Sequence, residues 1–544
     1  MKASFRISGN IIDVVAQRIF KGTVVVNDGK IATIIEEQIS EEQYILPGLI
    51  DAHIHIESSM LIPSEFAKMA VVHGTVGTVS DPHEIANVLG IQGVRFMINN
   101  GRKVPFKFNF GAPSCVPATS FETAGASLGT AEVEELLQMP EIKYLSEMMN
   151  FPGVLFNDPE VMKKLDLARK AGKPVDGHAP GLTGSDVEKY INAGISTDHE
   201  CFSIEEAREK INLGMKVLIR EGSAAKNFET LCPLLDEFPD QVMLCSDDKH
   251  PNDLETGHIN LEVKRALKKG FKTMNVLRSC TYNPVKHYHL DIGLLQIGDS
   301  ADFICIDNLT DFSILETYVM GEKVAERGKS LIERIVEEPL NNFDGKKIEP
   351  MELQVSYRGS RIRVQCAFDG QLITGSQLVE AKTENGQVIC DPSRDILKIV
   401  VKNRYFPAPA AIGFISGFGL KRGALASCVS HDSHNIVAVG ADDESIASAI
   451  NMIIEAKGGI SLVEGETRIM LHLPFAGIMS GEDGNTVARK YDQMDKKAHD
   501  MGSLLTAPYM TLSFMALLVI PALKISDKGL FDGTRFSFTE IFEK

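Results

Sequence analysis

Residues 47–55 read PGLIDAHIH, an apolar run that opens with Pro-Gly and ends on two histidines two positions apart. A short apolar run bounded by a Pro-Gly turn signal is typical of a buried strand. Residues i and i+2 of a strand point to the same side, so we expect His53 and His55 to face one way at the strand's end. Two imidazoles arranged like this suit a shared metal ion. For an arbitrary His-x-His pair, two packed or solvated histidines are an equally good interpretation.

The same rhythm of short apolar runs continues downstream, alternating with amphipathic helical windows. Eight strands, counting the one that ends near Asp51, in about 235 residues match the length of a (β/α)8 barrel of the TIM type. We therefore predict such a barrel over residues 49–285. Its other seven strands are expected at 75–80, 107–111, 142–146, 174–177, 195–198, 216–220 and 242–246. Helices are expected between them at 131–138, 159–171, 184–193, 204–212 and 259–269.

Strand-like sequence also flanks the barrel on both sides. Residues 5–36 read as short strands with a hairpin signal, and similar character returns at 293–306 and 316–329. We expect residues 1–48 and 286–340 to form one small β-sandwich domain, into which the barrel is inserted.

The last third of the chain predicts a separate domain. The charged stretch 337–350 reads as a linker. Beyond it, residues 351–544 begin with strands and carry helical patterns at 443–457 and 485–500. This combination indicates a C-terminal α+β domain.

Composition narrows the class of protein and its partners. Of 544 residues, 44% are apolar and 24% charged, as in an ordinary globular protein. The net charge of −17 disfavours nucleic acid and membrane surfaces as partners. The longest apolar stretch, 510–523, is too short to span a bilayer, and the N-terminus is not a secretory signal. Nine scattered cysteines without a Cys-x-x-Cys pair argue against disulfides and favour a cytoplasmic location.

Side chains that bind metals also follow other predicted strands. Strand four ends at Glu147, strand five at His178, strand six at His199, and strand eight at Asp247. Active sites of such barrels lie where the carboxyl ends of the strands meet. Four imidazoles and two carboxylates, one of them bridging, suit two divalent first-row metal ions. The predicted ligands are His53, His55, Glu147, His178, His199 and Asp247.

These motifs carry a family resemblance. The opening at 47–55, the pair Asn283-Pro284 and the segment GDSADF at 298–303 resemble the amidohydrolase superfamily. Most two-metal members have a carboxylated lysine at strand four, where this chain offers Glu147, with Lys143 four residues earlier. With that glutamate, the chain looks like the bacterial adenine deaminases over nearly its whole length. The motifs that carry this likeness are SDPHE at 80–84, STDHE at 196–200, SDDKHP at 246–251, SHDSHN at 430–435 and LPFAGIMS at 473–480.

The resemblance implies a reaction and its cofactors. Adenine and water would give hypoxanthine and ammonia, in purine salvage or adenine catabolism, through a hydroxide that bridges two divalent metal ions. The resemblance favours Mn²⁺, with Fe²⁺ or Zn²⁺ as alternatives. The partner is a small-molecule substrate, and we expect a homo-oligomer. The His-x-Glu and Pro-Cys-x-x-Cys signature of single-zinc nucleobase deaminases is absent.

The same resemblance assigns catalytic roles. Asp247 is expected to bind a metal ion and to take the proton from the bridging water. Glu200 is the candidate that moves a proton to the ring, unless it is an ordinary surface glutamate. His83, on the loop after strand three, is expected to hydrogen-bond the substrate or the leaving group, unless it only orders neighbouring carboxylates. Glu84 and Asp248 are the other expected substrate-binding residues.

Two other functions stay open. Another metal-dependent cyclic amidohydrolase or deacetylase would share the barrel and its ligands, and a lysine carbamate at strand four would favour it. A non-catalytic relative would keep the barrel as an assembly module, but it has no reason to retain six ligand-type residues at strand ends. In the C-terminal domain, His431 and His434 flank Asp432 and indicate an extra metal site, part of a lid, or a polar turn before a strand at 436–439.

Overall fold

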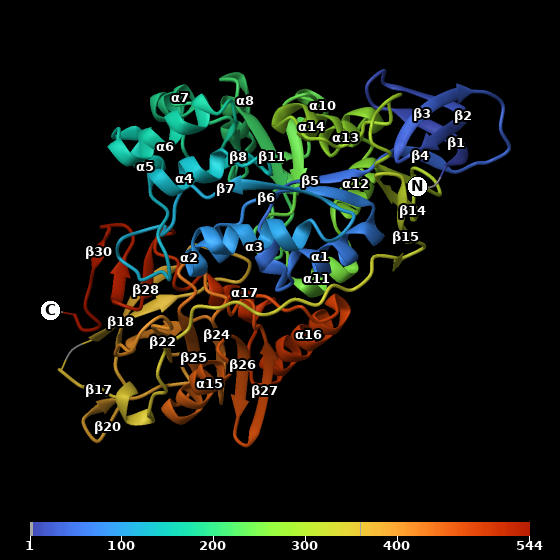
Figure 1. The fold of residues 1–544 in the computed structure, drawn as a ribbon. Coiled ribbons are helices and arrows are strands. Elements are labelled where there is room, and N and C mark those ends of the chain that lie inside the picture. The colour runs from blue at the N-terminus through green and yellow to red at the C-terminus, as the bar shows by residue number, and fades with distance from the viewer. Residues whose placement is uncertain (1–3, 360, 544) are drawn as a thin grey trace.

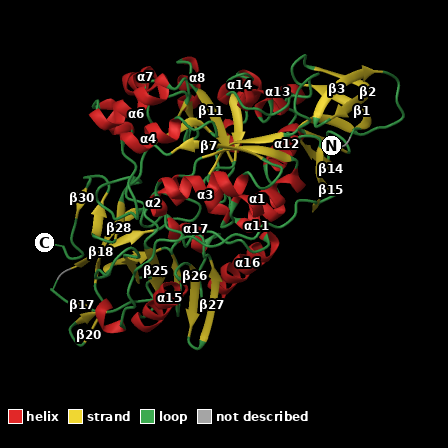
Figure 2. Ribbon diagram, in the orientation of Figure 1, coloured by secondary structure: helices red, strands yellow, loops and turns green. Residues whose placement is uncertain are grey.

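The computed structural model describes residues 4–359 and 361–543. In Figure 1, the blue-to-green helices and strands lie above the orange-to-red C-terminal elements. Helices alternate with strands in the upper region, whereas strands predominate in the lower one (Figure 2). The chain therefore has the mixed α/β content that the sequence predicts. Among the helices of the described ranges, none combines the length and the apolar character needed to cross a bilayer.

Eight parallel strands run through residues 49–245 in two sheets, with the orders β5-β6-β7-β8-β9 and β10-β11-β12. Backbone hydrogen bonds also connect the two sheets. The Ser196 N–H donates to the Val175 carbonyl at 2.9 Å, and the Asp247 N–H donates to the His53 carbonyl at 2.9 Å. The eight predicted strands are all present. Their bounds are β5 (Leu49–Ile54), β6 (Thr75–Ser80), β7 (Lys107–Ala112), β8 (Ile142–Met148), β9 (Val175–Gly177), β10 (Thr197–Asp198), β11 (Lys216–Arg220) and β12 (Val242–Cys245).

Helices connect these strands and cover the sheets with their apolar faces. Helix α12 buries Ile259, Val263 and Ala266, which lie at the i, i+4 and i+7 spacing of one helix face. Asp158 caps the N-terminus of helix α6, and its carboxylate accepts N–H groups of the first turn. The helices of this region are η1 (Ile56–Ser59), α1 (Pro63–Ala70), η2 (Val71–His73), α2 (His83–Leu89), α3 (Ile91–Gly101), α4 (Thr130–Leu137), α5 (Phe151–Leu155), α6 (Pro159–Lys170), α7 (Gly184–Asn192), α8 (Ile204–Asn212), α9 (Phe228–Leu231), α10 (Leu234–Glu237), α11 (Pro251–Thr256), α12 (Ile259–Lys268), α13 (Thr273–Ser279) and α14 (Tyr282–Tyr288).

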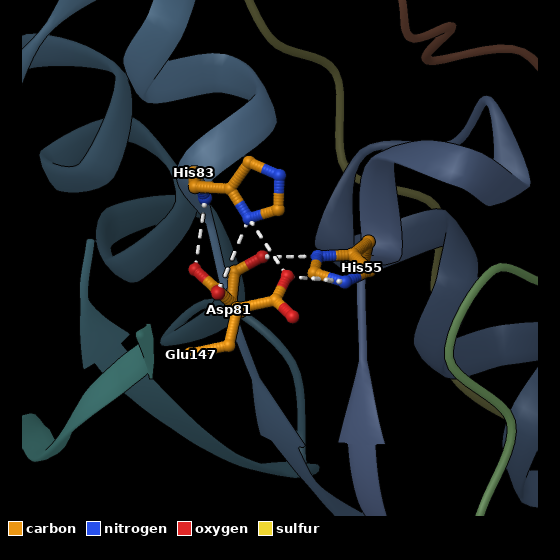
Figure 3. Close-up of side chains that lie close together, drawn as sticks. All are labelled: His55, Asp81, His83 and Glu147. Atoms are coloured by element: carbon orange, nitrogen blue, oxygen red, sulfur yellow. Dashed lines mark hydrogen bonds and ion pairs between the residues drawn. The ribbon is translucent and has the colours of Figure 1, made fainter. Parts of the chain in front are cut away.

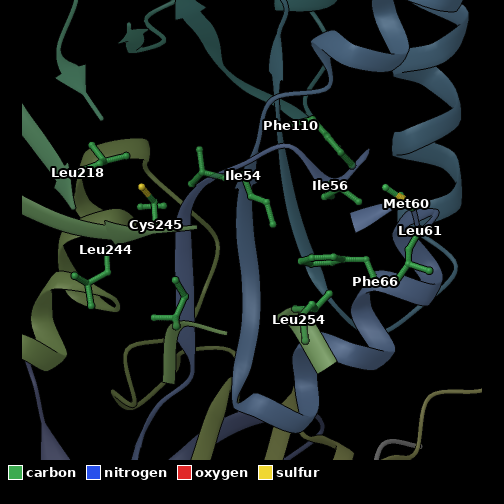
Figure 4. Close-up of a cluster of buried hydrophobic side chains, with 14 of the residues drawn as sticks. Ile54, Ile56, Met60, Leu61, Phe66, Phe110, Leu218, Leu244, Cys245 and Leu254 are labelled. Carbon is green, nitrogen blue, oxygen red and sulfur yellow. The ribbon is translucent and has the colours of Figure 1, made fainter. Parts of the chain in front are cut away.

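One apolar core fixes the strand ends relative to the helices. Ile54 on β5, Phe66 on α1 and Leu244 on β12 are fully buried in it (Figure 4). Burial of each such side chain contributes about 1.5–3 kcal/mol. Gly48 precedes β5 because a Cβ at that position would overlap the side chain of Val76 on β6. The Pro-Gly opening of the motif thus allows two neighbouring strands to approach closely.

Residues 5–47 and 303–330 form one mixed sheet of eight strands, with the order β16-β15-β14-β13-β4-β1-β2-β3. A small β-sandwich was predicted here. The strands instead share one hydrogen-bonded sheet because β4 pairs with β1 on one side and with β13 on the other. The strands are β1 (Phe5–Asp13), β2 (Arg18–Asn27), β3 (Lys30–Glu36), β4 (Tyr44–Pro47), β13 (Phe303–Ile306), β14 (Ile314–Val319), β15 (Glu322–Glu326) and β16 (Lys329–Ser330).

The C-terminal region is built on a second eight-stranded sheet, with the order β19-β18-β23-β22-β25-β24-β26-β27. Residues 331–349, which contain most of the predicted linker, have no helix or strand. The two predicted helices are present as α15 and α16. The elements are η3 (Pro350–Leu353), β17 (Val355–Ser356), β18 (Arg361–Cys366), β19 (Gly375–Glu380), β20 (Thr383–Glu384), β21 (Gln387–Val388), β22 (Leu397–Lys402), β23 (Ala411–Ser416), β24 (Ala424–Ser427), β25 (Ile436–Gly440), α15 (Asp443–Ala456), β26 (Gly459–Glu464), β27 (Thr467–His472), α16 (Gly484–Asp500), α17 (Pro508–Ser513), β28 (Leu523–Ser526), β29 (Gly529–Asp532) and β30 (Ser537–Phe538).

Candidate metal centre

Six buried or nearly buried side chains converge where the parallel strands end. They are the six residues that the sequence predicts as ligands. Glu147 at the end of β8 lies at the middle of the group: its Oε2 is 2.8 Å from His178 Nδ1 and 3.3 Å from His199 Nε2. Its Oε1 is 3.4 Å from His55 Nε2. One carboxylate therefore faces imidazoles from three strands, which is the geometry that a bridging ligand needs.

Lys143 does not take part in this cluster. Its Nζ donates a hydrogen bond to the Pro140 carbonyl at 2.9 Å in an exposed position. Because side chains alternate along a strand, Lys143 and Glu147 share a face of β8, but Lys143 lies a full four residues nearer the opposite end. The feature that would favour a lysine carbamate is thus absent from the strand-four position.

Neighbouring groups orient the imidazoles of His53 and His55, at the end of β5, for metal binding. The His55 Nδ1–H donates to the Asp81 carbonyl at 3.2 Å, which leaves Nε2 free to face the carboxylates. The His53 ring stacks on His199 with centroids 4.2 Å apart. Within the described ranges, neither ring nitrogen of His53 has a hydrogen-bond partner, although both are buried. Buried polar atoms without partners are costly, so this donor set fits metal ions that would satisfy them.

Asp247 follows β12 and lies between the two histidines of β5. Its N–H donates to the His53 carbonyl, and its own carbonyl accepts from the His55 N–H at 3.1 Å. A φ of 57° turns the chain there, and its carboxylate Oδ1 lies 3.2 Å from His55 Nε2 and 3.5 Å from His53 Nε2. An aspartate adopts this left-handed conformation more readily than most residues.

Arg220, the last residue of β11, links Glu200 and Asp247, the two acidic residues predicted to transfer protons. Its Nη1 donates to Asp247 Oδ2 at 2.7 Å and also to Glu200 Oε1, and its Nη2 donates to Glu200 Oε2 at 3.1 Å. Burial raises the pKa of both carboxyl groups, but the Arg220 guanidinium and the neighbouring imidazoles together outweigh it. The pKa of Glu200 is therefore lowered, and that of Asp247 lies well below its usual range. Glu200 is buried, which excludes the surface interpretation. The sequence analysis missed Arg220, although a charged residue at the end of the apolar run 216–220 was a signal for it.

Replacing Arg220 by methionine tests this buried ion pair. Arg220→Met leaves two buried carboxylates without their cation, so we expect a loss of about 3–5 kcal/mol in the free energy of unfolding. The matched control is Arg208→Met, which breaks an exposed bidentate pair with Glu237 and should cost less than about 1 kcal/mol. Urea unfolding of metal-loaded proteins measures both. Equal losses for the two variants would show that Arg220 has no special role.

His83 lies beside the cluster, but not where the strand count predicted. It follows β6, the second of the eight parallel strands, whereas the sequence analysis placed it after strand three. That prediction was wrong because 75–80 is the second run after residue 48. His83 Nδ1 is 3.2 Å from Asp81 Oδ2 and 3.6 Å from Glu147 Oε1. Figure 3 draws both contacts. The ring therefore contacts a neighbouring carboxylate and also borders the cluster.

A cavity lies over the cluster, and residues of the C-terminal region also line it. The predicted residues Glu84, Glu200 and Asp248 line it, as do Arg220 and His83. Its other wall comes from the C-terminal region. The sequence analysis related only His431 and Asp432 to a lid, because nothing in the local pattern indicates which loops face each other. This wall consists of Leu372, His431, Asp432, Phe514, Leu517 and Ile520.

Comparison with known proteins relates this geometry to a family. The amidohydrolase family model matches residues 44–324, and the model of the adenine deaminase C-terminal domain matches residues 371–537. An adenine deaminase of Salinibacter ruber is 54% identical over 100% of both chains. One from Methanosarcina mazei is 53% identical over 98% of this chain and 99% of its own. The chain belongs to the adenine deaminase family of amidohydrolases.

Membership of the adenine deaminase family agrees with the cluster described above. Amidohydrolases are metal-dependent, and the buried imidazoles and carboxylates at the strand ends form a site of that kind. Among solved structures, a β-aspartyl dipeptidase of Fervidobacterium islandicum aligns with 61% of this chain and 100% of its own, at 14% identity and a TM-score of 0.46.

Proposed function

We propose that this chain hydrolyses adenine to hypoxanthine and ammonia. The observation that carries the proposal is one cavity that is lined both by five of the six cluster residues, all but His53, and by apolar side chains of the C-terminal region. Membership of the adenine deaminase family supports the substrate. A flat purine ring matches such a cavity, with its apolar faces against the wall and its C6 toward the polar cluster.

The residues around the cavity suit two proton movements of this reaction, the loss of a proton from the attacking water and the protonation of the ring nitrogen. Divalent ions bound here would lower the pKa of water toward ~7 and so supply hydroxide at neutral pH. Asp247, ionised beside Arg220, takes the proton from the attacking water. Glu200 shares Arg220 with Asp247 and lines the same cavity, so we propose it as the group that gives a proton to the ring nitrogen. His83 and Asp248 border the position of the leaving amine.

The ligand set proposed for the two ions is the six-residue cluster, with Glu147 as the bridge. Nitrogen and oxygen donors of this kind accept Mn²⁺, Fe²⁺ and Zn²⁺, and we propose Mn²⁺ on the family likeness.

We also propose that the two parallel sheets close into one (β/α)8 barrel, with residues 1–48 and 286–340 as one domain and 351–544 as another. The backbone bonds of Ser196 and Asp247 between the sheets support that closure.

Adenine should be strongly preferred to adenosine. Leu372, Phe514, Leu517 and Ile520 form the apolar part of the wall, and the hydroxyl groups of a ribose that faces them would lose water there without gaining partners. We expect kcat/KM for adenosine to be lower by about 10²-fold or more, the scale on which a pocket rejects an added polar group. Ammonia release from adenine, adenosine, cytosine and guanine by manganese-loaded protein measures this, and chromatography follows dihydroorotate, whose ring opening releases no ammonia. Equal values for adenine and adenosine would contradict the proposal, and turnover of dihydroorotate alone would favour a cyclic-amide hydrolase.

A further inference from the structure

A second buried cluster joins the parallel-strand region to the C-terminal region. Glu84, at the start of α2, faces His431 and His434, which lie in the turn between β24 and β25. Glu84 Oε1 contacts His431 Nδ1, and Glu84 Oε2 is 2.5 Å from His434 Nε2. The three residues are 1–3% exposed. One carboxylate thus presents each oxygen to a different imidazole across the boundary of two regions.

In this cluster Glu84 Oε1 and His431 Nδ1 form a hydrogen bond, whereas the other polar side-chain atoms lack one in the part of the chain that the structure describes. Glu84 Oε2 and both ring nitrogens of His434 have no hydrogen-bond partner among the described residues, despite the short approach of Nε2 to the carboxylate. The same holds for Oδ2 of the adjacent Asp432. Glu84 Oε2 and His434 Nε2 lie close together without the geometry of a hydrogen bond, as two ligand atoms of one metal ion do. Leaving several such atoms unsatisfied in a buried position would be costly otherwise.

The backbone around the two histidines is held firmly. The His434 N–H donates to the Ser430 carbonyl at 2.7 Å, and His434 has a left-handed φ of 53°. The His431 N–H donates to the Ser513 carbonyl at 3.1 Å, and its ring stacks on Phe514 with centroids 4.6 Å apart. The imidazoles are therefore oriented by the fold before any ligand binds, as an ion-binding site requires.

We propose that Glu84, His431 and His434 bind a divalent transition-metal ion, in addition to any ion held by the Glu147 cluster. Two imidazoles and a carboxylate are a common ligand set of Zn²⁺. Two carboxylates, those of Glu84 and Asp432, lie buried here, and a divalent cation would balance their charge. Glu84 belongs to the parallel-strand region and the two histidines to the C-terminal region. The ion would therefore link the C-terminal wall of the cavity to the strand ends. The site does not depend on the proposed adenine reaction.

Zinc counting tests the proposal. Wild-type protein and His434→Ala are loaded with Zn²⁺, freed of excess zinc by gel filtration, and analysed for zinc per chain. We expect His434→Ala to hold one equivalent less than wild type. The matched control, His472→Ala, removes an exposed histidine whose ring bonds the Ala456 carbonyl, and it should hold as much zinc as wild type. Equal zinc in wild type and His434→Ala would overturn the proposal, whatever the total.

A measurement on wild-type protein covers the case in which His434→Ala does not fold. Crystals of the zinc-loaded chain are measured at the zinc absorption edge. An anomalous peak between Glu84 and His434 supports the site. Peaks confined to the Glu147 cluster overturn it and leave the proposed adenine reaction untouched. A peak beside Glu84 with none at Glu147 would support this site and count against the proposed catalytic centre, so the two proposals fail separately.

Discussion

Asp247→Asn is expected to keep much of the bound metal and to lose most of the turnover of adenine. The asparagine retains one oxygen beside His53 and His55 but removes the base, and general-base catalysis contributes about 10²–10⁴-fold. We expect kcat to fall by about 10³-fold. Arg220 would face a neutral amide in place of its carboxylate partner at 2.7 Å. Metal content and the deamination rate, measured on one preparation, check the expectation.

His53→Ala is the matched control for this prediction. His53 is fully buried and stacks on His199, so its loss should remove metal and activity together, because a ligand rather than a base is deleted. Near-normal turnover in Asp247→Asn would mean that the base lies elsewhere. Glu200 and Asp248 would then be the next residues to replace.

Glu147→Ala should be the most damaging substitution for metal binding. The carboxylate faces His55, His178 and His199 at 2.8–3.4 Å, so the variant loses the group to which all three are directed. Replacing residues that only orient ligands costs about 10–100-fold in affinity or activity, and removal of a bridging ligand should exceed about 100-fold. Elemental analysis should show the loss of at least one ion per chain.

A control for Glu147→Ala is Glu229→Ala, which removes an exposed glutamate paired with Lys269. It should change neither the metal content nor the deaminase activity. Full metal occupancy together with full activity in Glu147→Ala would refute the bridging role.

Much of the fold and of the cluster follows from the sequence for a physical reason. Buried parallel strands are continuous apolar runs, so 75–80 and 216–220 were predicted with the bounds that the structure has. Strand ends in such a fold meet at one face, which is why His53, Glu147 and Asp247 could be grouped before any coordinates were considered. Local pattern and topology agree here, and that agreement makes prediction possible.

Contacts between distant segments could not be predicted in this way. Arg220 binds Glu200 and Asp247 through side-chain geometry that no spacing reveals. The wall formed by Phe514 and Leu517 lies more than 200 residues from the strands that it covers. The single sheet in place of a sandwich has the same origin, since the pairing of β4 with β13 joins chain segments that are separated by the whole parallel-strand region.

The most direct test of the account is the conversion of adenine by the manganese-loaded chain, before and after removal of metal with a chelator. The account predicts that hypoxanthine and ammonia form in equal amounts, that chelation abolishes both, and that added Mn²⁺ restores them. Absence of hypoxanthine from the loaded protein, or a rate unchanged by complete removal of metal, would contradict the account.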